Sequence, residues 1–395
     1  MSATQIPRTV WMLGLVSLLM DMSSEIIHAL LPLFLTVQLG LSVAMVGLID
    51  GIAEATASVT KLFSGYISDR FGKRKPLILI GYGLAALSKP VFALAGSAPL
   101  ILGARFADRI GKGLRGAPRD ALIADVTPPA IRGRAFGLRQ SLDTVGAFAG
   151  PLAATALMIA LASDIRMIFW IATVPALFAV VLIIFGVRDV ERLPSVSEAK
   201  VPLRFADLRG MPQAYWGVVV IAAVLTLARF SEAFLILKAN AEGLPLALAP
   251  LVLVVMNLVY AVGAYPVGSF ADRMPAKYLL GLGLFALIAA DLLLAMTSGL
   301  FGVTIGIILW GAHMALTQGL LAKMIADHAP PTLRGSAFGL FHLVTGMALL
   351  LASLIAGLLW DGFGSDATFF AGAGFAVVAL MLVSRYPKVR ADDRA

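Results

Sequence analysis

The sequence has no cysteine and little charge, and each shortage excludes a class of protein. Without cysteine, the 395-residue chain forms neither disulfides nor thiolate metal sites, and its four scattered histidines do not make a metal-binding pattern. Charged residues are only 14% of the chain, against about 25% in soluble domains. No glycine-rich phosphate-binding loop and no catalytic constellation is visible. We therefore expect no enzyme, no metal, no cofactor and no step driven by ATP.

The basic excess does not indicate a nucleic-acid partner. The net charge is +8 and the isoelectric point is about 9.8, but the basic residues lie scattered between long apolar stretches. In a membrane protein such a distribution indicates orientation rather than nucleic-acid binding. The first apolar run follows Arg8 without a cleavage-type site, so we expect it to stay as a helix and not to be removed as a signal peptide.

Hydrophobic residues make up 59% of the chain, and its mean hydropathy is +0.92. A helix needs about 20 apolar residues to span the hydrocarbon of a bilayer. Turn residues and charge clusters divide the sequence into twelve such segments, which predicts an all-α membrane protein with a lipid bilayer as its surroundings. The predicted helices are 9–38, 42–67, 75–96, 98–126, 132–162, 166–187, 213–237, 244–270, 277–298, 300–327, 334–360 and 366–385.

The longest polar stretch lies between the sixth and seventh predicted helices. It predicts a linker at 188–212 between two six-helix domains, 1–187 and 213–395. With both termini on one side, twenty Lys and Arg residues fall on that side and only two on the other. Because basic loops stay in the cytoplasm, the termini are predicted to be cytoplasmic and the protein to lie in the inner membrane.

The two halves repeat each other. The pieces IAD, PP, RG and AFGL of residues 123–138 recur in the same order 202 residues later, at 325–340. The Gly-x-x-x-Asp-Arg pattern of 65–70 also recurs, at 268–273. Repeats at a fixed offset are typical of internally symmetric architectures. The repeat therefore predicts two pseudo-symmetric bundles, with a small-molecule substrate site near the bilayer midplane.

The loop between the second and third helices resembles the signature loop of the major facilitator superfamily. The matching residues are Gly65, Asp69, Arg70, Gly72, Lys73 and Arg74, with a degenerate second copy at Asp272 and Arg273. The resemblance covers the whole chain, including the twelve spans and the central linker. It implies two helical bundles that rock about a central cavity, lined mostly by helices one, four, seven and ten.

This signature loop predicts a gate. We expect Asp69 to meet the positive N-terminus of the eleventh helix, near residues 336–339, and to stabilise the outward-open state. By the repeat, Asp272 would cap the fifth helix near residues 134–137. The second copy carries Met274-Pro275-Ala276 where the first has Phe71-Gly72-Lys73, so the second latch is expected to be weaker.

Ionisable residues within the predicted helices concentrate in the first half. Such residues are costly in a membrane and tend to face a cavity or a partner. Helical spacing puts the acids of helix one on one face, those of helix two on another, and a basic stripe along helix four, with Glu25 and Arg109 at similar depth. We predict proton coupling by seven of these residues: Asp21, Glu25, Asp50, Glu54, Arg105, Asp108 and Arg109.

Other polar residues are candidates for substrate contact, although the same residues serve equally well as polar contacts between helices. Arg229 and Glu232 lie three residues apart and could instead neutralise each other. His28 could be a hydrogen-bonding helper rather than a proton carrier. The candidates are His28, Arg229, Glu232, Asn257, Tyr260, His313 and Gln318.

Gly146, Gly150 and Pro151 in helix five resemble the motif of drug/proton antiporters within the superfamily. The glycines would let helices approach closely, and the proline would bend the helix. The resemblance implies a monomeric secondary transporter that exports small amphiphilic or drug-like molecules against protons. The basic stripe of helix four favours an alternative, a proton symporter that imports a small organic anion or a metal chelate.

Overall fold

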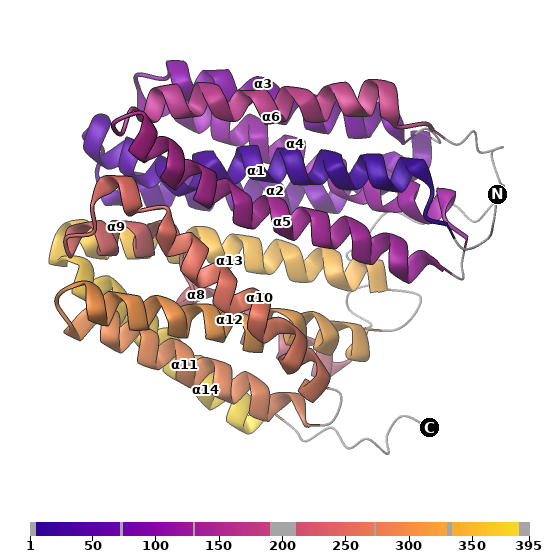
Figure 1. Ribbon diagram of the computed structural model, residues 1–395. Coiled ribbons are helices and arrows are strands. Elements are labelled where there is room, and N and C mark those ends of the chain that lie inside the picture. The colour runs from indigo at the N-terminus through magenta and orange to yellow at the C-terminus, as the bar shows by residue number, and fades with distance from the viewer. Residues whose placement is uncertain are drawn as a thin grey trace. The chain divides into compact units, whose positions relative to one another are not determined.

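The computed structural model describes residues 5–71, 74–128, 131–189, 211–271, 274–329 and 334–386; within these, the side chains of 65–71, 265, 268–271 and 334–336 are not described. The described chain is helical throughout and contains no strand. The helices of the first half are α1 (Arg8–Leu33), continued by the π-helix η1 (Phe34–Gln38), α2 (Val43–Phe71), α3 (Lys75–Leu94), α4 (Ala98–Val126), α5 (Arg132–Ala160) and α6 (Ile165–Gly186). Figure 1 shows the ribbon.

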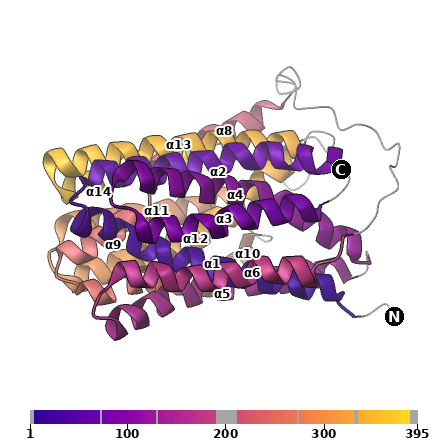
Figure 2. The ribbon, with the colours of Figure 1, turned by 90° about the horizontal axis from the view of Figure 1, so that it is seen from above.

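The second half begins with two shorter helices in place of one. Its elements are α8 (Gln213–Ala228), α9 (Ala233–Ala241), the short 3₁₀ turn η3 (Leu246–Leu248), α10 (Leu251–Ala271), α11 (Ala276–Met296), α12 (Leu300–His328), α13 (Arg334–Phe363) and α14 (Ser365–Arg385). The helices within each half run roughly along one direction, as Figure 2 shows from above.

The structure corrects the predicted seventh helix. We expected one helix over 213–237, but the helix stops at Ala228 and resumes at Ala233. The helical spacing assumed for Arg229 and Glu232 therefore does not apply, because both residues lie in this break. The backbone N–H of Arg229 still bonds back to Leu225 and Thr226, so the first segment ends in a closed turn.

Eleven segments of the described chain are long and apolar enough to span a membrane. The predicted span that does not meet this test is α4, since its middle carries the basic stripe described above. The described helices thus reproduce the predicted spans within a few residues at each end, apart from the break in the seventh and the start of the eighth, where α10 begins at Leu251 rather than at 244.

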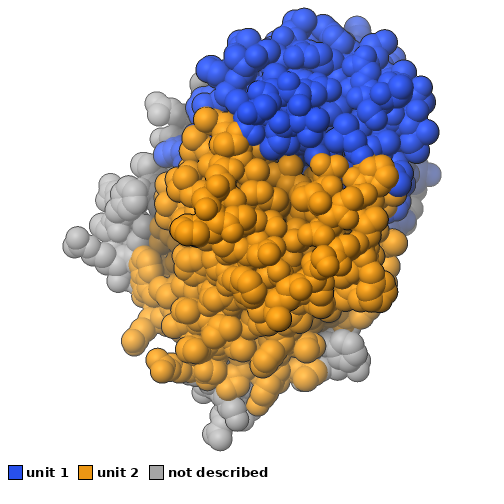
Figure 3. All heavy atoms as spheres, turned by 90° about the vertical axis from the view of Figure 1, so that its left-hand side faces the viewer, with its two compact units in different colours: residues 1–41, 52–202, 246–250 blue, residues 42–51, 203–245, 251–395 orange. Residues whose placement is uncertain are grey.

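The chain divides into two compact units (Figure 3). Unit 1 comprises 1–41, 52–202 and 246–250, and unit 2 comprises 42–51, 203–245 and 251–395. In unit 1, α1 packs on α5 and α6, and α3 packs on α4 and α6. In unit 2, α8 packs on α13 and α14, and α11 packs on α12 and α14. If the predicted spans are numbered within their own half, the pairing is the same in both units. The first span packs on the fifth and sixth, and the third packs on the fourth and sixth, as the repeat requires.

Both units contain aromatic contacts in their cores. Unit 1 has a core cluster of aliphatic side chains and alanines around the buried ring of Tyr82, and a separate contact between the Phe34 and Phe169 rings, whose centroids lie 5.3 Å apart. Unit 2 has an aromatic cluster in which the Phe230 ring lies 5.2 Å from Phe234 and 5.4 Å from Trp310, measured between centroids. Phe230 belongs to the break after α8, so aromatic packing fixes the place where the helix is interrupted.

Candidate ion-coupling site

The α4 helix carries most of the buried charge of unit 1. Arg105, Asp108, Arg109, Arg115 and Arg119 are each no more than 8% exposed. Their spacing of three, four and six residues keeps them on the face of α4 that packs inward. Charges at this depth persist only with partners, so the neighbouring helices must supply them.

The middle of the network is a chain of alternating charges. Lys89 of α3 donates to Asp108 at 2.8 Å, and its ammonium also bonds Ser24 of α1 at 3.0 Å. The other oxygen of Asp108 lies 3.7 Å from Arg109, whose guanidinium pairs with Glu54 of α2 at 3.1 Å. Four elements are thus joined by two acids and two bases, so the charge is balanced locally.

Arg105 lies one turn further along α4. Its guanidinium is 2.8 Å from Nδ1 of His28 on α1. Since arginine only donates, the ring nitrogen must accept, which fixes the tautomer of a neutral His28 with its proton on Nε2. The structure therefore places His28 within the charge network.

Two acids meet where α1 passes α5. The carboxyl groups of Asp21 and Asp143 lie close enough to interact with each other. Three guanidinium groups surround this acid pair at the limit of ion pairing: Arg115 is 3.8 Å from Asp21, and Arg119 and Arg139 are each 3.9 Å from Asp143. A hydrogen bond between two carboxyl groups requires one proton, whereas two ionised carboxylates repel each other. This geometry suits the binding and release of a single proton.

The remaining α4 arginine ties the helix to its neighbours. Arg119 donates to Ser17 of α1 at 3.1 Å and to Tyr82 of α3 at 3.4 Å, and pairs with Asp120 at 3.0 Å. The guanidinium of Arg115 lies 4.5 Å above the Tyr82 ring. These contacts fix the orientation of the arginines that surround the acid pair.

The structure separates Glu25 from Arg109, which we expected to act together. Within the described residues Glu25 makes no ion pair, and Arg109 pairs instead with Glu54. Glu25 lies one turn beyond Asp21 on α1, against Gly150 of α5. The reason is steric: α1 packs so closely on α5 that Glu25 lies over the α5 backbone rather than over α4.

The helix-five residues take the packing role expected of the glycines. A Cβ atom added at Gly150 would lie 2.6 Å from Cβ of Glu25 and 2.9 Å from the Met22 carbonyl, and one at Gly146 would meet the backbone of Leu18. Pro151 lies inside an otherwise continuous α5. Small residues at these positions bring α1 and α5 together and so bring Asp21 to Asp143.

Asp50 belongs to unit 2, apart from the other predicted coupling residues. Its carboxylate accepts a hydrogen bond from Ser231 in the helix break at 2.8 Å. Nearby, Asp361 at the end of α13 accepts hydrogen bonds from the backbone N–H groups of Val43 and Ala44, at 3.0 and 2.8 Å. These contacts anchor the first residues of α2 to unit 2, while the same helix continues into unit 1.

The predicted gate lies largely outside the described residues. Gly72, Lys73, Asp272 and Arg273 are not described, and neither are the side chains of Gly65, Asp69 and Arg70. Both latch contacts therefore stay predictions. Arg74 is described: its guanidinium bonds Asp125 of α4 at 2.7 Å. Sequence reasoning did not find Asp361, because the predicted eleventh helix ended one residue before it.

The substrate candidates of unit 2 lie on α10, on α12 and in the break after α8. His313 is fully buried on α12, and its Nδ1 lies 2.9 Å from the Gly283 carbonyl of α11, as a contact between helices would. Asn257, Tyr260 and Gln318 are half-buried on α10 and α12. Arg229 and Glu232, in the break, each take part in interactions.

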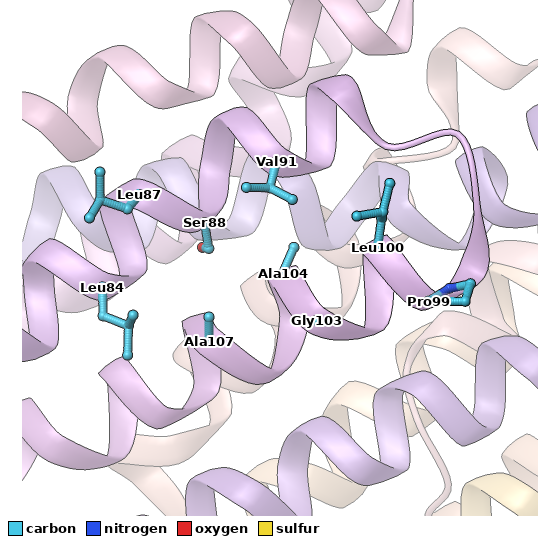
Figure 4. Close-up of a pocket in the computed structure, with 9 residues that line it drawn as sticks. All are labelled: Leu84, Leu87, Ser88, Val91, Pro99, Leu100, Gly103, Ala104 and Ala107. Carbon is cyan, nitrogen blue, oxygen red and sulfur yellow. The ribbon is translucent and has the colours of Figure 1, made fainter.

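One pocket lies between α3 and α4 and has a volume of about 240 Å³. Figure 4 shows its lining, which includes Leu84, Leu87, Val91 and Leu100. Leu87 is 69% exposed, and the lining has no charged residue. A pocket of this kind suits an acyl chain of the bilayer rather than a polar substrate, so we do not place the functional site there.

No group of three or more His, Asp or Glu side chains among the described residues is arranged to hold a metal ion.

The sequence model of the Major Facilitator Superfamily matches residues 13–256 and 233–395. The chain belongs to the major facilitator superfamily. It is therefore a multi-pass secondary transporter of a small molecule and not an enzyme.

Relatives in the superfamily extend over nearly the whole chain. An uncharacterized MFS-type transporter of Methanocaldococcus jannaschii is 30% identical over 96% of this chain and 95% of its own. The multidrug resistance protein MdtH of Proteus mirabilis is 24% identical over 80% of this chain and 78% of its own. Among solved structures, the nucleoside transporter NupG aligns with a TM-score of 0.79 at 14% identity, covering 97% of this chain and all of NupG. A bacterial homologue of the human lysosomal transporter Spinster aligns with a TM-score of 0.78 at 17% identity, over 96% of this chain and 97% of its own.

Proposed function

We propose that the protein couples transport to protons through the acid pair Asp21–Asp143. The observation that carries the proposal is the close approach of the two carboxyl groups, with three arginines only at 3.8–3.9 Å. A change of a few tenths of an ångström in either direction decides whether the arginines or a proton neutralise the acids. Glu25, one turn further along α1 and without an ion pair in the described chain, is the next proton acceptor.

The experiment is transport by the purified protein in liposomes with an imposed pH gradient. Asp143→Asn removes the shared proton but keeps the size of the side chain, so gradient-driven transport should be abolished while exchange without a gradient persists. Asp327→Asn is the matched control, because Asp327 is exposed and pairs with the half-buried Lys323 at 3.3 Å. Transport that ignores the pH gradient and follows sodium would contradict proton coupling.

For direction, we propose export of small amphiphilic or drug-like molecules. The close approach of α1 and α5 at Gly146 and Gly150 is what the antiporter-like motif requires, and the MdtH relatives bear the name of multidrug resistance proteins. Cells that express the protein should accumulate more of such a compound when an uncoupler is added.

The alternative is proton symport that imports a small organic anion or a metal chelate. The observation in its favour is the basic face of α4, on which Lys112 is exposed. Against it, Arg109, Arg115 and Arg119 already face acids. The same uncoupler experiment separates the two proposals, because a symporter's substrate would accumulate less without the gradient.

We further propose that the protein works as a monomer in the cytoplasmic membrane, divided into domains 1–187 and 213–395 by the linker 188–212. The twenty-to-two distribution of loop Lys and Arg supports cytoplasmic termini. Reporter fusions at each terminus that are active only in the cytoplasm test this orientation.

A further inference from the structure

A buried acid in unit 2 has no partner. Asp291 of α11 is 0% exposed, and neither of its carboxyl oxygens has a hydrogen-bond partner among the described residues. It makes no ion pair there either, in contrast to the acids of unit 1. An ionised carboxylate without partners is among the most expensive groups to bury, so a carboxyl in this setting requires a bound cation or a proton.

A glycine on α14 leaves space for the Asp291 carboxyl group. A Cβ atom added at Gly372 of α14 would lie 2.7 Å from Oδ2 of Asp291, 3.1 Å from the Phe230 ring and 3.3 Å from the Ala228 carbonyl. The Asp291 carboxyl, the Phe230 ring and the last carbonyl of α8 therefore all border Gly372. Half-helix C-termini and interrupted backbone at membrane depth are where transporters bind coupling ions.

Two further buried polar atoms lie without partners on the neighbouring α12. Within the described chain, Nε1 of Trp310 and Nε2 of His313 have no hydrogen-bond partner, and both side chains are fully buried. Trp310 packs against Phe230, which in turn borders the space around Asp291. Unsatisfied polar atoms are rare in protein interiors, so these four atoms on three residues of unit 2 point to a functional role.

The charged surroundings of Asp291 are sparse. On α12, His313 lies mid-helix, while Lys323, Asp327 and His328 lie in its last two turns, where Lys323 pairs with Asp327. The break contributes Arg229 and Glu232, which already take part in interactions. The α8 helix has no charged residue, and α14 carries its charges, Asp366 and Arg385, in its first and last turns. No charged side chain among them pairs with Asp291.

We propose that Asp291 is a proton-binding site of unit 2, loaded and unloaded when residues 229–232 rearrange. The ligand is a proton rather than a metal cation, because a hard cation needs several oxygen ligands and the observed oxygens are one carboxyl and one carbonyl beside aromatic rings. On loading, a proton from water bonds one carboxyl oxygen of Asp291; on unloading it returns to water. The site is independent of the acid pair in unit 1.

The test is infrared difference spectroscopy of the purified protein after a pH jump from about 9 to about 5. Solvent-exposed carboxyl groups have pKa values of about 4 and stay mostly ionised over this range, whereas a carboxyl whose pKa is raised by burial becomes protonated. The wild type and Asp327→Asn should both show the C=O band of a protonated carboxyl in dry surroundings. The band should be lost in Asp291→Asn and in Asp291→Leu, the second of which keeps the interior filled if the amide variant does not fold.

Several outcomes would overturn the proposal. All spectra are compared in the Asp21→Asn background, which removes the shared carboxyl proton of unit 1. These outcomes are a band that stays constant across the jump, a titrating band that survives both Asp291 variants, or a band removed by sodium at constant pH. The result is separable from the coupling proposal, since Asp21→Asn should leave the Asp291 band in place whether or not that variant still transports.

A second variant tests the packing argument. Gly372→Ala places a methyl group against the carboxyl and should shift the frequency of the band, because the carboxyl must move into new surroundings. Gly374→Ala is the matched control on the same helix, as its added Cβ meets no heavy atom within 4 Å. Identical bands in the two variants would contradict the placement of Asp291 beside the break.

Discussion

The buried acids Asp108 of unit 1 and Asp291 of unit 2 have opposite surroundings. Unit 1 surrounds each buried charge with partners, as in the chain from Lys89 through Asp108 and Arg109 to Glu54. Unit 2 keeps Asp291 apart from every partner in the described chain and packs aromatic rings near it. The difference teaches that burial alone does not define a coupling residue. Removing one member of a network leaves its buried partners with uncompensated charge, whereas removing an isolated acid leaves no other charge unpaired.

The largest effect should come from breaking the network of unit 1. Lys89→Met leaves the carboxylate of Asp108 buried without its 2.8 Å partner, which should cost about 3–5 kcal/mol of unfolding free energy. The control is Lys238→Met in unit 2, whose partners Glu242 and Asp366 have side chains 20% and 60% exposed and so stay hydrated. Denaturation of the two purified variants in the same detergent measures both losses. Equal losses of unfolding free energy in the two variants would contradict the distinction between buried and hydrated charge partners.

A smaller effect should follow from the contact that brings the acid pair together. Gly150→Ala forces a Cβ atom against the α1 backbone and should destabilise the protein by about 1–3 kcal/mol. Gly137→Ala on the same helix meets no atom within 4 Å and should be neutral or stabilising, since alanine favours helix by about 1 kcal/mol. Melting temperatures of the two variants decide this. The account fails here if Gly150→Ala melts like Gly137→Ala.

At the edge of unit 2, a pH-dependent contribution should be smaller still. The Gly299 N–H and the Lys238 ammonium hold the pKa of Glu242 below its ordinary value. A lowered pKa stabilises the fold above the unfolded value of about 4.3, and this stabilisation is lost as the pH falls through the folded pKa. Glu242→Gln should therefore reduce the free energy of unfolding at neutral pH by less than about 1 kcal/mol, seen as a lower melting temperature. In acid the variant and the wild type should melt at the same temperature. A deficit that instead grows in acid would show that the sign is wrong.

The smallest effect on stability should come from the most deeply buried acid. Asp291→Leu removes no hydrogen bond and no ion pair of the described chain, and an apolar side chain of similar size suits the site. Its melting temperature should equal or exceed that of the wild type. A loss as large as that of Lys89→Met would mean that Asp291 has a strong partner, which would end the contrast between the units.

The fold was largely predictable because membrane spans are visible as apolar segments and repeats as recurring residue patterns in the sequence. Hydropathy places the helices within a few residues, and the repeat at 123–138 and 325–340 matches the repeated helix pairing of the two units. The break at 229–232 was not predictable, since Arg229 and Glu232 fit a helix as well as a turn. What interrupts the helix is tertiary packing, with Phe230 held between Trp310 and Phe369.

The candidate site was predictable in its members but not in its pairs. Helical spacing found the faces that carry Asp21, Glu54 and Arg109, because periodicity on one helix is visible in sequence. Which faces meet depends on how the helices rotate against each other. The partnership of Asp21 with Asp143, and the distance of Glu25 from Arg109, therefore required the structure.

The central claim is that the Asp21–Asp143 pair carries the coupled proton. Its most direct test is the proton movement that accompanies substrate transport, measured with a pH-sensitive dye inside liposomes that hold the purified protein. The wild type should move protons in step with substrate, and Asp143→Asn should still exchange substrate but move no protons. Proton movement that continues unchanged in Asp143→Asn would contradict the account.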